Sequence, residues 1–124
     1  MLVYGDVTKK VINLAIEVHK ELGPGLLEKV YAECLCYEFL KAGIQFQKEK
    51  GLPVCYKGKL LDCEYRIDFV VEDKVILELK SVDLLSKIHE AQILTYMKLS
   101  GIKVGLLINF NVLAIKNGIR RFVL

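Results

Sequence analysis

Two predicted strands of this chain carry charged side chains inside otherwise apolar runs. The segment is residues 66–80, Arg-Ile-Asp-Phe-Val-Val-Glu-Asp-Lys-Val-Ile-Leu-Glu-Leu-Lys. Asp68 interrupts the first run, and Glu78 and Lys80 interrupt the end of the second. A charge placed among apolar residues is costly unless it is paired or bound to a metal. These three side chains are therefore the most informative residues of the chain.

The turn between the two strands decides whether the carboxylates meet. Directly opposite residues of an antiparallel pair lie on the same face of the sheet. Asp68 is opposite Glu78 only if a turn of odd length centres on Asp73. A two-residue turn would place Asp68 opposite Leu77 and send Glu78 to the other face. Glu78 and Lys80 share a face in either case, because they are two residues apart.

The three side chains suit a site for a divalent metal. Two carboxylates held close together in apolar surroundings repel each other, and one of them takes up a proton unless a cation neutralises the pair. Hard oxygen ligands suit Mg²⁺ or Mn²⁺. Lys80 is then placed to orient a water or to stabilise charge on a phosphate.

An ordinary salt-bridged edge strand is the alternative for the same residues. In that arrangement Lys80 pairs with Glu78. Asp68 then pairs with Arg66 or Lys74. The matching position of Asp68 on the neighbouring strand favours a metal site over this alternative.

The remaining pattern predicts helices that flank a mixed sheet. Apolar residues at helical spacing predict helices at residues 6–22, with Asp6 as N-cap, 26–42 and 86–100. Alternating or continuous apolar runs predict strands at residues 45–50, 52–56, 59–71, 74–79, 104–109 and 119–123. A hairpin turn is predicted at residues 56–59. The order α-α-β-β-β-α-β(-β) is typical of α/β folds with two or three layers.

The composition describes a single domain over residues 1–124. Of its 124 residues 53% are apolar, which is ample for one core and too few for two domains. The net charge of +3 is compatible with a nucleic-acid partner without arguing for one. The four cysteines lack metal-binding spacing, which indicates free thiols in a reducing cytoplasm. Neither a signal peptide nor a membrane span is expected.

An Asp on one strand and a Glu-x-Lys on the next, followed by a helix, resembles the PD-(D/E)XK nuclease superfamily. The chain is most similar to its Gly-x-x-Glu-x-x-Tyr family, whose naming motif stands at residues 25–31 as Gly-Leu-Leu-Glu-Lys-Val-Tyr. The resemblance continues through residues 65–69, 76–80, 88–96 and 105–110. The resemblance covers nearly the whole chain, and its motifs follow one another in the same order as in the family. The residue before Asp68 is Ile67 rather than Pro, at a position that varies in the superfamily.

The resemblance implies a restriction-endonuclease-like fold and a set of site residues. RecB-like nucleases share a helical Glu, an Asp, a Glu-x-Lys and a Gln-x-x-x-Tyr. Here these are Glu28, Asp68, Glu78 with Lys80, and Gln92 with Tyr96. By that likeness Asp68 and Glu78 hold Mg²⁺ or Mn²⁺, and the backbone carbonyl of Leu79 completes the site. Glu28 contributes directly or through a metal-bound water, and Gln92 contacts the substrate backbone or supports the metal.

These expectations leave more than one function open. The first is a metal-dependent nuclease that hydrolyses phosphodiester bonds in DNA, with Lys80 stabilising the transition state. The second is a non-catalytic binding or assembly module that keeps the nuclease fold, in line with the small size and weak net charge. A metal-binding protein of another purpose is a third hypothesis. A homodimer is compatible with the apolar content and with exposed edge strands.

Overall fold

A computed structural model describes residues 3–124 as an α/β domain built on one five-stranded sheet. Its helices are α1 (Gly5–Leu22), α2 (Glu28–Ala42), α3 (Lys87–Ser100) and the short 3₁₀ helix η1 (Ile115–Gly118). Its strands are β1 (Phe46–Tyr56), β2 (Lys59–Val71), β3 (Val75–Lys80), β4 (Val104–Asn109) and β5 (Ile119–Val123). The sheet order is β1-β2-β3-β4-β5, with β3 and β4 parallel and the other pairs antiparallel. The predicted mixed α/β architecture is confirmed.

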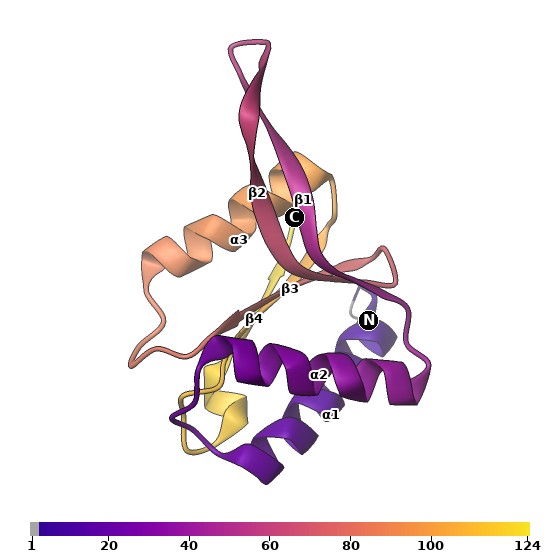
Figure 1. Ribbon diagram of the computed structural model, residues 1–124, viewed down its shortest axis with the longest axis vertical. Helices are drawn as coiled ribbons and strands as arrows, with labels where there is room; N and C mark the ends of the chain where they lie inside the picture. The colour runs from indigo at the N-terminus through magenta and orange to yellow at the C-terminus, as the bar shows by residue number, and fades with distance from the viewer. Residues whose placement is uncertain (1–2) are drawn as a thin grey trace.

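Helices cover both faces of the sheet and make three layers (Figure 1). One cluster of buried apolar side chains joins the sheet to α1 and α2, and a second joins its other face to α3. Along β3, Val75, Leu77 and Leu79 belong to the first cluster and Ile76 belongs to the second. Because both faces are covered, the central strands are apolar on each side and a charge in them stands out. No helix within residues 3–124 is long and apolar enough to cross a membrane.

The helices begin close to their predicted starts, with two corrections. The N-cap of α1 is Tyr4 rather than Asp6, and Asp6 lies in the first turn instead, where the helix dipole favours an acid. α2 begins later than predicted, at Glu28. α3 begins at Lys87, one residue after its predicted start, and the hydroxyl of its N-cap Ser86 accepts the amide of His89. The later start of α2 places Glu28 at the exposed end of the helix.

β1 and β2 form one long hairpin, so the predicted break of β1 at Gly51 is wrong. Gly51 lies beneath the Glu64 carboxylate of β2, and a Cβ at this position would come within 2.5 Å of it. The hairpin closes at Lys57 and Gly58, whose φ angles of 50° and 80° suit the predicted two-residue turn. Since β3 pairs with β2 only over residues 69–71, much of the hairpin projects beyond the sheet (Figure 1). We call residues 53–64 the arm.

β2 and β3 are joined by a turn centred on Asp73, the condition for their acids to meet. The paired residues are Phe69 with Leu77, Val70 with Ile76, and Val71 with Val75. The Lys74 amide closes the turn by donating to the Val71 carbonyl at 3.0 Å. One more step in this register places Asp68 opposite Glu78.

Candidate functional site

Asp68 and Glu78 hold each other at the point where the β2–β3 pairing ends. The Asp68 amide donates to Oε2 of Glu78 at 2.7 Å, and the Leu79 amide donates to Oδ2 of Asp68 at 2.8 Å. Each carboxylate thus accepts a hydrogen bond from a backbone amide of the opposite strand. In a regular sheet a backbone carbonyl would accept that hydrogen bond instead. Within residues 3–124 no hydrogen bond occupies the second oxygen of either carboxylate. Both carboxylates therefore keep one oxygen that can bind a cation.

Burial opposes the presence of two negative charges in this pair. Glu78 is 3% exposed. Burial raises the pKa of Glu78 to about 8, and the neighbouring charge of Asp68 adds to the rise. Burial also raises the pKa of Asp68, although the Leu79 amide and the Lys80 ammonium act in the opposite direction. At neutral pH the pair therefore retains a proton unless a cation takes its place. An all-oxygen pair of this kind fits Mg²⁺ or Mn²⁺.

A cavity of about 450 Å³ lies between α2 and the β1–β2 hairpin, beside Asp68. Its lining residues are Glu28, Lys29, Ala32, Glu33, Lys48, Glu49, Asp68, Phe69 and Leu79. Lys48 and Glu33 form an ion pair across it. Among residues 3–124, no group of three side chains of the metal-ligating kinds comes together. Of the three predicted carboxylate ligands, the structure thus brings Asp68 and Glu78 into direct contact and places Glu28 with Asp68 in the lining of one cavity.

Lys80 and Gln92 meet on the side of the sheet that α3 covers. Nζ of Lys80 donates to Oε1 of Gln92 at 3.1 Å. One turn along the helix, Tyr96 is 5% exposed, and burial raises the pKa of its phenol, with the charge of Glu78 adding to the effect. The predicted residues of α3 therefore lie against the strand that carries Glu78 and Lys80.

The alternative of a salt-bridged edge strand is wrong. β3 lies between β2 and β4, so it is not an edge strand. Within residues 3–124 the salt bridges are Lys48 with Glu33 and Arg120 with Glu90, and none involves Asp68, Glu78 or Lys80.

Tyr31 fixes the loop that leads into α2, and with it the position of Glu28. Its side chain is fully buried, and its ring stacks on Phe110 with centroids 4.5 Å apart. Its hydroxyl donates to the Gly23 carbonyl at 2.6 Å and accepts the Leu26 amide at 3.2 Å. The tyrosine of the Gly-x-x-Glu-x-x-Tyr pattern is thus a positioning residue that belongs to the core.

Ser81 and Asn109 hold the backbone that follows Lys80, and the sequence pattern had not singled out either of them for the site. The Ser81 hydroxyl donates to the Leu26 carbonyl at 2.5 Å, which ties the end of β3 to the loop before α2. Asn109 is 2% exposed, and its side-chain amide both donates to the Val82 carbonyl and accepts the Val82 amide. A buried Asn at the end of an apolar strand is the signal that could have revealed this role.

Glu49 is a further residue of the cavity that the sequence pattern did not reveal. Its neighbours Lys48 and Lys50 pair with the residues on either side of Asp68, so that Glu49 faces Asp68 across the hairpin. Its φ of 53° is left-handed, which is costly for a non-glycine residue inside a strand. Its charge adds to the burial that raises the pKa of Asp68.

The hairpin bends where Glu49 faces Asp68. Phe69 packs in the cluster with α1 and α2, whereas Ile67, two residues earlier, packs in the cluster with α3. Residues two apart in a regular strand lie on one face, so β2 changes its orientation at Asp68. The bend separates β2 from β3 and leaves the carboxylates at an opening of the sheet.

Comparison with known proteins identifies the family. No curated protein matches the chain. The crystal structure of SSO0001 is similar at 15% sequence identity with a TM-score of 0.48, over 91% of this chain and 65% of that one. The chain thus spans about two thirds of the length of that protein. A sequence model of the PD-(D/E)XK nuclease superfamily matches residues 5–122, a range that includes each of the site residues above. The chain therefore belongs to the PD-(D/E)XK nuclease superfamily.

Proposed function

We propose that this chain is a metal-dependent nuclease of the Gly-x-x-Glu-x-x-Tyr type, which hydrolyses phosphodiester bonds in DNA with Mg²⁺ or Mn²⁺. Membership of the superfamily supports nucleic acid as the class of substrate. The observation that carries the proposal is the pair formed by Asp68 and Glu78. Both pKa values are raised by burial, and each carboxylate has one oxygen left for a cation. A divalent cation would remove the cost of keeping two charges side by side.

Some residues of the site would bind the metal, and others would stabilise charge on the phosphate. Asp68 and Glu78, with the carbonyl of Leu79, would hold the metal, and Glu28 would act from across the cavity directly or through a water. A bound Mg²⁺ or Mn²⁺ supplies a Lewis acid that lowers the pKa of a water molecule. Lys80, oriented by Gln92, would stabilise the negative charge that develops on the phosphate.

The test is cleavage of a panel of single-stranded DNA, duplex DNA and RNA by purified protein with Mn²⁺ or Mg²⁺. Wild type should cleave DNA, and Lys80→Ala should be slower by roughly 10²–10³-fold, the effect of removing one charge-stabilising donor. Lys87→Ala removes an exposed lysine at the start of α3 and is the matched control. Equal cleavage by wild type and Lys80→Ala would show that the nuclease activity comes from elsewhere.

A second candidate is a binding or assembly module that keeps the fold without catalysis. It is favoured by one observation, that no third ligating side chain joins Asp68 and Glu78 within residues 3–124. Calorimetric titration with Mn²⁺ and Mg²⁺ separates the two candidates. A nuclease binds the metal and loses that binding in Glu78→Gln, whereas the module binds neither metal.

A further inference from the structure

The tip of the arm carries exposed cations and an exposed aromatic ring. Between Cys55 and Leu61 the charged residues are Lys57 and Lys59, with no acid among them. Both lysines are exposed, and neither takes part in a salt bridge within residues 3–124. Tyr56 is 61% exposed, and Nζ of Lys57 lies 5.5 Å from the centre of its ring. An aromatic side chain this exposed contributes little to the core of its own domain.

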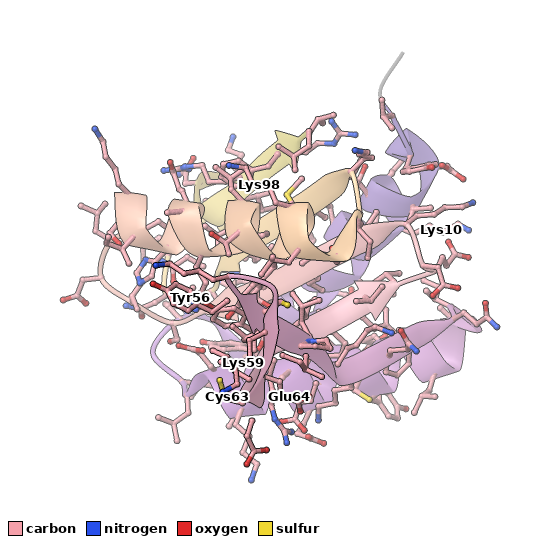
Figure 2. All side chains as sticks on the ribbon, turned by 90° about the horizontal axis from the view of Figure 1, so that it is seen from above. Lys10, Tyr56, Lys59, Cys63, Glu64 and Lys98 are labelled. Atoms are coloured by element: carbon pink, nitrogen blue, oxygen red, sulfur yellow. The ribbon has the colours of Figure 1, made fainter. Side chains whose placement is uncertain are left out.

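The geometry of the hairpin presents these side chains together. Tyr56 and Lys59 are directly paired across the turn, so they lie on one face of the arm. Lys57 occupies the turn itself, next to Gly58. The arm projects away from the helices in Figure 1 and points toward the viewer in Figure 2, where Tyr56 and Lys59 are labelled on it. The tip is therefore accessible to a large ligand.

We propose that the tip, residues 56–59, holds a nucleic-acid strand, with Lys57 and Lys59 on phosphates and Tyr56 stacked on a base. Lysines neutralise phosphates, and an exposed aromatic ring offers a stacking surface to any base. The inference rests on the proposed function, since it concerns the polymer that the site would cleave.

The acidity of the cavity beside Asp68 gives a reason why the chain would hold a nucleic acid at the tip, away from that cavity. Four carboxylates line it, those of Glu28, Glu33, Glu49 and Asp68, against the two lysines Lys29 and Lys48, of which Lys48 is paired with Glu33. The acids still outnumber the lysines, so in the absence of a metal this surface disfavours phosphates and cations outside it would add to the attraction. A second copy of the chain fits the tip less well. A two-fold contact between tips would place the lysines of one copy against those of the other.

The experiment measures binding of fluorescein-labelled single-stranded DNA and of the same sequence as a duplex, by anisotropy in EDTA over a series of salt concentrations. The variant Lys57→Ala/Lys59→Ala should lower the slope of log K against log salt by about 1.4 for the single strand and about 1.8 for the duplex. Lys9→Ala/Lys10→Ala removes the same charge from exposed positions of α1 and should leave the slope unchanged.

The aromatic contact is tested separately. Tyr56→Ala should weaken binding of the single strand by roughly tenfold, the scale of one lost stacking contact, and Tyr56→Phe should retain the wild-type affinity. These positions lie on an exposed turn, so the unfolding temperature of each variant should match that of wild type.

Five outcomes decide between a nucleic-acid strand, a second copy of the chain and no role for the tip. An unchanged salt slope in the tip variant, or an equal change in the α1 control, overturns the inference. If the tip variant no longer sediments as a dimer but keeps its DNA affinity, the tip binds a second copy of the chain and the inference is overturned. If wild type cleaves DNA and the tip variant binds DNA as the α1 control does, the arm has no role in binding and the nuclease proposal is retained. Tip-dependent binding without cleavage in Mn²⁺ supports the arm and refutes the nuclease.

Discussion

Asp68 donates its backbone amide to the carboxylate of Glu78, and its own carboxylate accepts the amide of the residue that follows Glu78. This exchange takes the place of backbone pairing where β2 bends away from β3. The two acids therefore act on the fold through their hydrogen bonds and on any ligand through their charges. Replacement of an acid by its amide separates the two effects, because the amide still accepts the hydrogen bond and carries no charge.

The metal-free protein should lose stability as the pH rises from about 4.5 to about 8. The ordinary pKa of Glu78 is 4.5 and the folded protein raises it to about 8, chiefly through burial. Between these values the folded state binds more protons than the unfolded chain, so each rise in pH favours unfolding. The raised pKa of Asp68 acts in the same direction. The expected loss is on the order of a few kcal/mol.

Urea denaturation in EDTA at about pH 5 and about pH 9 measures this dependence. Glu78→Gln has no proton to lose and should show a much flatter profile, so the difference between the two proteins isolates the carboxyl group. Parallel profiles for wild type and Glu78→Gln would contradict the prediction.

Mn²⁺ or Mg²⁺ should raise the unfolding temperature more at about pH 9 than at about pH 5. Metal and proton compete for the same carboxylate, so binding to the folded state is stronger once the proton has left. Thermal unfolding with and without Mn²⁺ at both pH values is the measurement. Glu78→Gln should lose the effect, and Glu17→Gln, on an exposed position of α1, should keep it.

Tyr31→Phe should destabilise the protein by about 1–2 kcal/mol and weaken metal binding. The change removes the hydroxyl and keeps the ring stacked on Phe110. The Gly23 carbonyl and the Leu26 amide then both lose their hydrogen-bond partner. Urea denaturation gives the stability, and titration calorimetry gives the Mn²⁺ affinity. Tyr37→Phe, at a residue of the same helix that is 61% exposed, is the control and should change neither.

Glu49→Gly should raise the stability of the metal-free protein by about 1 kcal/mol. Glycine adopts the left-handed backbone without steric cost, which outweighs its greater freedom in the unfolded chain. Glu49→Ala removes the same charge and keeps the strain, so it should be less stable than Glu49→Gly. Equal stabilities in urea denaturation would show that the backbone at this position carries no strain.

The meeting of Asp68 and Glu78 could be predicted because strand geometry is simple. Side chains alternate with a period of two, so a turn centred on Asp73 is the condition for the acids to be opposite each other. The structure has that turn. The predicted contact of α3 with the site depended on the family resemblance, because Gln92 and Tyr96 alone form an ordinary helical pair.

What the sequence could not reveal depends on contacts between distant segments. The predicted strands broke at Gly51, but here the glycine lies within β1 and makes room for Glu64 of the partner strand. Glu49 reads as one charge in an exposed segment, and its place opposite Asp68 depends on the bend of the hairpin. Ser81 becomes important only when the fold brings the loop before α2 beside it.

The exchange between Asp68 and Glu78 also shapes how such a chain can evolve. A descendant that no longer cut nucleic acid would still need an acceptor for the amides of residues 68 and 79, since losing one costs about 1–3 kcal/mol. Selection for folding alone would therefore preserve an oxygen acceptor at both positions, as the acid or as its amide. Within residues 3–124 the side chains of Lys80 and Gln92 bond to each other and to no backbone group, so after a loss of activity these two residues would be the first to be replaced.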